Sequence, residues 1–251
     1  MTDNAPRPTP PPDTEAGAPF APTQWSVILQ ARRDSTNRRA ALEQLCASYW
    51  LPIYGYLRRR GHSPADAEDL TQNFFVYLLD GDFLDRPDPA KGRFRGYLVG
   101  ALRHFLSEHF ERASAQKRGG RAQFIDWSSL DAERELATVD QPAADPSSVF
   151  ERSWALTLLA RALHKLEDEQ STPARREQFA VLKAFLSSAP GAGDYDRAAA
   201  ALGTTRTNVA VWVHRLNQRY AELVKLEVAA TVSDPTEVRA EMQHLLQALR
   251  A

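Results

Sequence analysis

The chain has 251 residues, 43% hydrophobic and 25% charged, which suits one large or two small globular domains and excludes a fibrous or wholly disordered protein. No apolar run approaches the roughly 18 residues of a membrane span, and the first residues lack the pattern of a secretory signal. The single cysteine, Cys46, excludes an internal disulfide. We therefore expect a cytoplasmic protein without a membrane span.

The net charge of −1 averages over blocks of opposite sign along the chain. Residues 63–88 hold seven acidic residues and one arginine, whereas residues 91–121 hold eight basic residues and two glutamates. Residues 122–151 are again acidic, and residues 197–225 carry five basic residues against one glutamate. Such a chain can present cationic surface to phosphates at two places while staying near neutral overall.

The first half of the chain predicts a helical domain after a tail. Residues 1–22 are rich in proline with almost nothing to bury, so we expect a disordered tail. Apolar residues then recur at steps of three and four, the period of amphipathic helices. Gly61 ends one helix, Ser63 has the type and position of the next helix cap, and a fourth helix begins near Phe94. Residues 23–118 are thus expected to form a domain of four helices.

The second half predicts a linker and more helices. Residues 119–145 combine glycines and acids without a sustained period and read as a flexible acidic linker. A second helical domain is expected over residues 146–232, started by Asp145 as a cap, and a last amphipathic helix over residues 233–251. We expect this last helix to pack on the second domain; binding of a regulator is the alternative. Its apolar residues are Met242, Leu245, Leu246 and Leu249.

No segment shows convincing strand alternation, so the predicted fold is all-α, with two small helical domains joined by the flexible linker. Catalytic motifs are also missing. His104 and His109 are five residues apart, which does not fit the four-residue step of a helical zinc site. There is no phosphate-binding glycine loop ending in Gly-Lys-Ser/Thr and no Cys-x-x-Cys pair. We predict no enzyme, metal or cofactor.

The strongest local motif begins at Asp194. An alanine-rich segment closes at Gly203, and Thr205 can cap a second helix directly afterwards, which is the pattern of a helix-turn-helix. In such motifs the start of the second helix enters the major groove. The expected core positions of that helix are Val209, Val213, Leu216 and Tyr220. The residues left for DNA are Arg206, Thr207, Asn208, Ala210, Val211, His214 and Arg215. A plain helical hairpin shares much of this pattern and is the alternative.

A second candidate for nucleic-acid binding is the basic helix that starts at Phe94. Cations there can hold phosphates, and aromatic rings can stack on unpaired bases. The candidate residues are Arg95, Tyr97, Arg103, His104, Arg112, Lys117 and Arg118. The helical period places Phe94, Phe105 and Phe110 in the core. The basic residues are interpreted equally well as a solvated charged face that binds no nucleic acid.

Taken in order, several segments resemble the group IV (extracytoplasmic function, ECF) sigma-70 factors of bacterial RNA polymerase. The likeness covers about Trp25 to Lys225 and is closest to a branch in planctomycetes and related bacteria. The segments that carry the family likeness are 67–75, 94–98 and 202–205, and those that suggest the branch are 23–26, 49–52 and 92–95. The resemblance implies a region 2 four-helix domain, a region 4 helix-turn-helix domain and no catalytic activity.

The resemblance also implies partners and roles. Core RNA polymerase and promoter DNA are the expected partners, and an anti-sigma factor is a further candidate. The residues implied to dock on the coiled coil of the largest polymerase subunit are Asp66, Asp69, Gln72 and Asn73. The basic helix and the residues after it, through Arg118, are implied to bind the non-template strand of the minus-10 element, and the helix from Arg206 to read the minus-35 element.

The sequence departs from the family pattern in both DNA-binding helices. Tyr97 stands where the family usually has Trp, His104 where Asn is common and Glu108 where Asp is common. Ala210, Val211 and Trp212 stand where the family often has Lys, a small polar residue and Arg, which predicts a weaker or more apolar minus-35 contact. Two other classes stay open: a helix-turn-helix regulator that acts without polymerase, and an all-helical interaction scaffold.

Overall fold

The computed structural model describes residues 35–80, 93–115, 133, 136, 145–232 and 234–250. The expected tail, residues 1–22, lies outside the described residues, as does nearly all of the expected linker, residues 119–145. The described residues form eight α-helices, two short 3-10 helices and no strand, so the all-α prediction is confirmed over this part of the chain. None of these helices is both long and apolar enough to cross a membrane.

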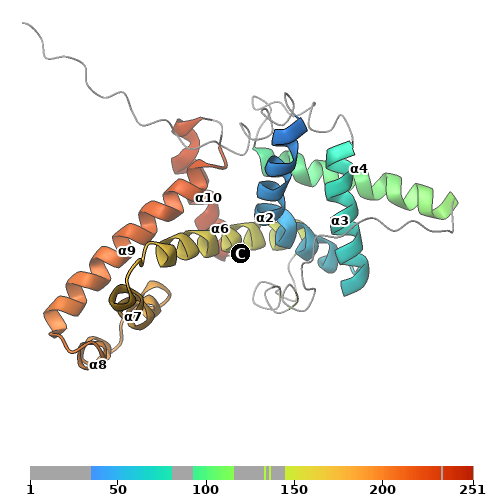
Figure 1. Cartoon of the computed structure of the whole chain (residues 1–251). Coiled ribbons are helices and arrows are strands. Elements are labelled where there is room, and N and C mark those ends of the chain that lie inside the picture. The colour runs from blue at the N-terminus through green and yellow to red at the C-terminus, as the bar shows by residue number, and fades with distance from the viewer. Residues whose placement is uncertain are drawn as a thin grey trace, which may run out of the picture.

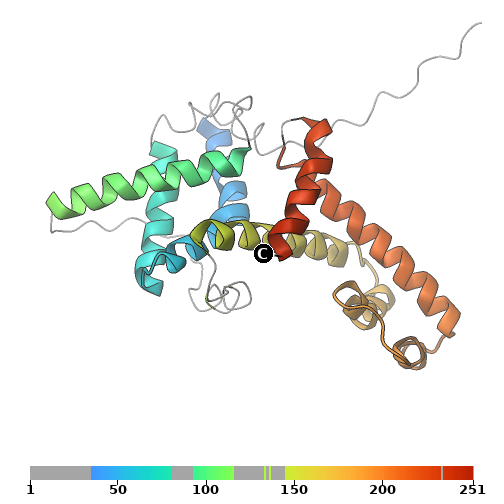
Figure 2. The same ribbon diagram turned by 180° about the vertical axis from the view of Figure 1, so that it is seen from behind.

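The first three described helices form a compact group. They are α2 (Ser35–Arg59), α3 (Pro64–Asp80) and α4 (Phe94–Ala115). Helices α2 and α3 lie side by side, and α4 crosses them, with its C-terminal end projecting beyond α3 (Figures 1 and 2). Aromatic rings fill the space between them. Phe74 and Phe105, for example, pack with ring centroids 5.5 Å apart.

Local signals set the start of α3, as expected. The Ser63 hydroxyl accepts a hydrogen bond from the Asp66 amide at 3.1 Å and donates one to the Asp66 carboxylate at 2.6 Å. Gly61, with φ of +91°, makes the preceding turn in a conformation that other residues rarely adopt. The Asp66 carboxylate also lies at the positive end of the helix dipole.

The remaining elements follow from residue 146. They are α6 (Pro146–Asp168), α7 (Pro173–Leu182), η3 (Lys183–Leu186), α8 (Asp194–Ala201), α9 (Arg206–Ala229), η4 (Pro235–Glu237) and α10 (Val238–Arg250). Helices α7, α8 and the start of α9 form a small group at the far end of the molecule from α3 and α4 (Figure 1). Helix α6 runs from one group to the other.

Helix α6 packs closely on α2, a contact that the sequence did not predict. Phe150 of α6 stacks on Tyr49 of α2 with ring centroids 6.4 Å apart. A β-carbon on Gly55 would lie 3.2 Å from Val149, so glycine permits this close approach. One buried apolar cluster continues from α2 and α3 through α6 to α9 and α10. The division into domains stays a prediction, but helix α6 shares its core with both groups.

Helix α10 packs against α6 and α9. Leu245 and Ala248 are buried there, and Arg152 of α6 donates a hydrogen bond to the Leu249 carbonyl at 2.9 Å. Leu246, which we counted among the apolar contacts of this helix, is instead 50% exposed because it lies on the opposite side from Leu245 and Ala248. The C-terminal helix therefore packs against the other helices of the same chain.

Candidate nucleic-acid interface

The four residues predicted to bind polymerase lie together on α3. Asp66, Asp69 and Asn73 are exposed and follow the helical period, and Gln72 lies partly buried beside them. The Gln72 side-chain nitrogen is buried without a hydrogen-bond partner among the described residues. Val76 continues the same face and is 38% exposed. An acidic surface with an exposed apolar residue and an unused donor is typical of a face that a partner covers.

The predicted DNA-binding residues of α4 have different surroundings. Arg103 and His104 are exposed, and Tyr97 is partly buried. Arg103 donates hydrogen bonds to the Ser147 hydroxyl at 3.1 Å and to the Tyr56 hydroxyl at 3.4 Å, which orient its guanidinium. The residues whose side chains lie outside the described part are Arg112, Lys117 and Arg118.

Arg95 does not lie on the surface, contrary to its predicted role. Its side chain is 4% exposed and pairs with Glu241 of α10 and, at 2.8 Å, with Glu151 of α6. Its guanidinium also lies 4.3 Å from the ring centroid of Trp154. The sequence prediction placed Arg95 by its position in a basic helix, but these long-range contacts bury it. In this conformation Arg95 is not accessible to DNA.

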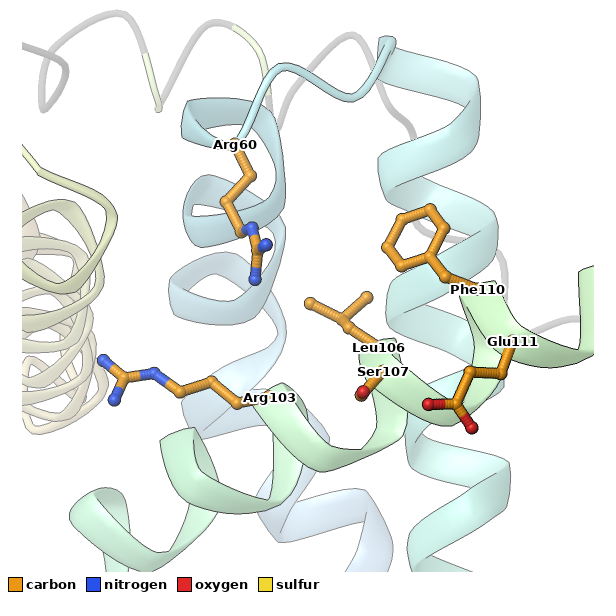
Figure 3. Close-up of a pocket in the computed structure, with 6 residues that line it drawn as sticks. All are labelled: Arg60, Arg103, Leu106, Ser107, Phe110 and Glu111. Atoms are coloured by element: carbon orange, nitrogen blue, oxygen red, sulfur yellow. The ribbon is translucent and has the colours of Figure 1, made fainter. Parts of the chain in front are cut away.

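A groove runs along α4 next to the end of α2 (Figure 3). It has a volume of about 460 Å³. Its lining residues are Arg60, Arg103, Leu106, Ser107, Phe110 and Glu111. Arg60 follows α2 and extends its guanidinium toward the α4 side chains (Figure 3). The Arg103 guanidinium points away from Phe110, toward Ser147 of α6, whereas Arg60 extends into the groove (Figure 3). Arginine can hold phosphate and an exposed ring can stack on an unpaired base.

Phe110 is 49% exposed, whereas its helical period predicts the core. The ring lines the open groove beside α3 and is therefore not enclosed between packed helices (Figure 3). The Phe110 ring stacks on His62, with centroids 5.9 Å apart. Burial, followed by the charge of Arg60, lowers the pKa of His62, so this ring favours its neutral form. A neutral imidazole leaves the positive charge of the groove to its arginines.

Sequence reasoning missed Arg60 as a candidate. The run Arg58, Arg59 and Arg60 looks like the usual basic end of a helix. The structure separates them: Arg58 pairs with Glu133 at 2.5 Å, whereas Arg60 lines the groove. The available signal was the position of Arg60 just beyond the helix end, where its side chain is free to turn toward α4.

The predicted DNA-binding residues of α9 all lie exposed near its N-terminus. They are Arg206, Thr207, Asn208, Ala210, Val211, His214 and Arg215. The Thr205 hydroxyl caps the helix by accepting a hydrogen bond from the Asn208 amide at 3.3 Å, and Gly203 makes the preceding turn with φ of +59°. Val209 and Val213 face the other way, buried with α8. Leu216 and Tyr220, expected in the core, are only partly buried.

Two other arginines of α8 and α9 are already paired. Arg219 contacts Glu169 at 2.6 Å and Glu222 at 2.9 Å, and Arg197 pairs with Asp194. The basic character of the exposed N-terminal turns of α9 therefore rests on Arg206 and Arg215. In the described part of the chain, no group of three or more histidine, cysteine or acidic residues is placed to hold a metal ion.

The comparison with known families agrees with this geometry in one region. Residues 45–116 match Sigma-70 region 2, and this span includes most of α2, all of α3 and all of α4. The match covers less than a third of the chain and shows a likeness to region 2 of sigma-70 factors in this segment. No curated protein and no solved structure matched the chain.

Proposed function

We propose that the chain is an alternative sigma factor of the ECF group, of the planctomycete-type branch, which directs core RNA polymerase to a set of promoters in the cytoplasm. The observation that carries the proposal is the region 2 match over residues 45–116, because the acidic face of α3 and the groove of α4 both lie within it. The protein contributes binding energy and no catalytic step of its own.

Polymerase binding is assigned to the face of α3. Asp66 and Asp69 give it negative charge suited to a basic partner, and Gln72, Asn73 and Val76 supply polar and apolar contact. Pairing the buried Gln72 nitrogen with an acceptor from the partner stabilises the complex, because an unsatisfied buried donor costs free energy.

Promoter opening is assigned to α4 and its groove. Tyr97, Arg103 and His104, with Arg112, Lys117 and Arg118 as expected from the sequence, contact the non-template strand of the minus-10 element. Arg60 and Phe110 add a cation and a ring to this surface. Unstacking a base step costs a few kcal/mol, and stacking on an aromatic ring returns about 1–3 kcal/mol per base. Capture of a flipped base can thus offset much of the cost of melting.

Minus-35 recognition is assigned to the start of α9, with α8 and α9 as the helix-turn-helix of a region 4 domain. Arg206 and Arg215 provide phosphate or base contacts, and Ala210 and Val211 provide apolar ones. An anti-sigma factor stays a candidate partner of this proposed function.

The test is association with purified core RNA polymerase. Asp69→Arg combined with Gln72→Ala should abolish co-purification and run-off transcription. Circular dichroism should stay unchanged, because Asp69 is exposed and alanine in place of the partly buried Gln72 adds no bulk and removes an unpaired donor. The matched control is Glu177→Arg, an exposed acid on α7, which should retain both activities. Undiminished co-purification of the α3 variant removes the docking assignment.

The same experiment separates the two other classes. A helix-turn-helix regulator that acts alone protects a promoter tightly without core enzyme. An interaction scaffold shows DNA binding that is weak and insensitive to salt, because no phosphate contacts release counterions. Neither behaviour fits the proposed sigma factor.

A further inference from the structure

Two arginines at the start of α4 share one carboxylate of α10. Glu241 is 1% exposed and contacts Arg95 through one oxygen and Arg93 Nε through the other, at 3.0 Å. The Arg93 side chain is 39% exposed, so solvent reaches one of the two arginines that contact Glu241. Each oxygen of the carboxylate therefore faces a different guanidinium. Figure 2 shows how α10 approaches the N-terminal end of α4.

Further groups hold this arrangement from the side of α6. Glu151 Oε2 lies 2.8 Å from Arg95 Nε and 2.8 Å from His244 Nε2 of α10. The Thr231 hydroxyl lies 3.5 Å from Glu241. The charged groups that surround Arg95 thus come from α4, α6 and α10, and Trp154 covers its planar face.

The contact is close but not ideally directed. Arg95 Nε and Glu241 Oε2 are buried, and neither has a partner in hydrogen-bond geometry among the described residues. Burial, the largest influence, lowers the pKa of Arg95, which indicates that its charged form loses hydration here. Burying charged groups without full hydrogen bonding is costly, so the contact contributes less than its short distances suggest.

Two guanidinium groups that bind two oxygens of one anion also form the arrangement with which proteins bind phosphate. We propose that Arg93 and Arg95 form a phosphate-binding site for nucleic acid, which Glu241 of α10 occupies within the same chain until α10 moves away. This inference rests on the proposed function, because promoter DNA supplies the phosphate. Helix α10 is then an intramolecular competitor of DNA at the start of the DNA-binding helix.

The short length of α10 is compatible with detachment from the other helices. The helix has 13 residues, a length at which an isolated helix is marginal in water. Its apolar contact with the core comes from the buried Leu245 and Ala248 and the partly buried Val238, Met242 and Leu249, and its end is held by the hydrogen bond from Arg152. Once α10 leaves, Arg95 keeps Glu151 and Trp154 as neighbours, so the site retains its shape while losing the competing carboxylate.

The experiment measures binding of the full chain to a fluorescent single-stranded DNA of mixed sequence over a range of salt concentrations. Glu241→Gln should bind at least about five-fold more tightly than the unmodified chain, as expected for a typical coupling between two sites. One added phosphate contact should also make the slope of log K against log salt steeper by about 0.7. The matched control, Glu237→Gln, makes the same charge change at an exposed position of η4 and should leave the slope unchanged.

A second variant loosens α10 without touching its carboxylate. Arg152→Gln removes the hydrogen bond to Leu249 and one positive charge, yet it should also tighten DNA binding, which a general charge effect cannot produce. Amide hydrogen exchange of α10 should become faster when DNA is added to the unmodified chain. Circular dichroism checks that both variants are folded.

The results separate this proposal from the proposed function. Equal affinity and slope for Glu241→Gln and Glu237→Gln overturn the competition by α10. Loss of DNA binding in all variants overturns the phosphate site. Association with core polymerase tests the sigma-factor role independently, because it depends on the face of α3 and not on α10.

Discussion

The carboxylate of Glu227 on α9 lies 3.0 Å from the Arg161 guanidinium on α6. Lys165, one turn further along α6, lies 2.5 Å from the other oxygen of the same carboxylate. Glu227 is 3% exposed, whereas its two partners reach solvent. This pair of ion contacts, with the hydrogen bond from the Tyr220 hydroxyl to the Leu159 carbonyl at 3.1 Å, fixes α9 against α6.

We predict that Glu227→Gln lowers the free energy of unfolding by about 1–2 kcal/mol, because a buried acceptor of two cations is lost but both cations stay partly hydrated. Urea denaturation followed by circular dichroism measures the change. Glu222→Gln is the control, since Glu222 is 63% exposed and its pair with Arg219 is worth at most about 0.5 kcal/mol. Equal changes in both variants contradict a bracing role for Glu227.

A second prediction concerns the cap of α6. The Asp145 carboxylate accepts hydrogen bonds from the Ser148 hydroxyl and from the amides of Ser148 and Ser147, and these bonds lower its pKa, with the hydroxyl as the largest cause. A lowered pKa in the folded state stabilises the fold above the unfolded pKa, and the contribution is lost as pH falls through the folded pKa. Asp145→Ala should therefore lower the free energy of unfolding by about 1 kcal/mol at neutral pH, typical of an N-cap.

The measurement is urea denaturation at neutral pH and again in acid, below the folded pKa of Asp145. The difference between the variant and the unmodified chain should shrink in acid. Glu167→Ala, at an exposed position near the other end of α6, serves as the control and should show no such loss at neutral pH. A difference that stays constant with pH argues that the carboxylate charge is not what stabilises the cap.

The sequence predicted the helix starts because their causes are local. Ser63, Asp145 and Thr205 each act on backbone amides two or three residues away, so residue type and spacing suffice. The helical period likewise predicted which side of α9 is buried and which is exposed. Val209 and Val213 are buried, as the period predicts, and the predicted DNA-binding residues lie on the exposed sides.

The sequence predictions failed where contacts between residues far apart in the chain determine the structure. Arg95 and Glu241 are 146 residues apart, and no local pattern indicates that they meet. The packing of Phe150 on Tyr49 joins α6 to α2 across the expected linker for the same reason. Phe110 follows the apolar period, but period alone does not tell that this face of the helix borders an open groove.

The exposed ring of Phe110 leads to a third prediction. Phe110→Ala should weaken binding of single-stranded DNA by about five-fold or more, because stacking of one base on an aromatic ring is worth about 1–3 kcal/mol. Fluorescence anisotropy with the same mixed-sequence DNA measures the affinity. Leu226→Ala, which truncates a 55% exposed apolar residue on α9, should leave it unchanged. If both variants bind DNA as the unmodified chain does, the groove of α4 does not hold a base.

The last prediction concerns the start of α9. Replacing Arg206 and Arg215 with alanine should weaken binding of duplex DNA upstream of a start site. The slope of log K against log salt should become shallower by about 1.8 if each arginine neutralises one phosphate. Arg175 and Arg176, exposed on α7, provide a control with the same loss of charge. Because general electrostatic attraction falls equally in both double variants, only a larger loss in the α9 variant indicates direct contact. Identical slopes place the upstream contact elsewhere on the protein.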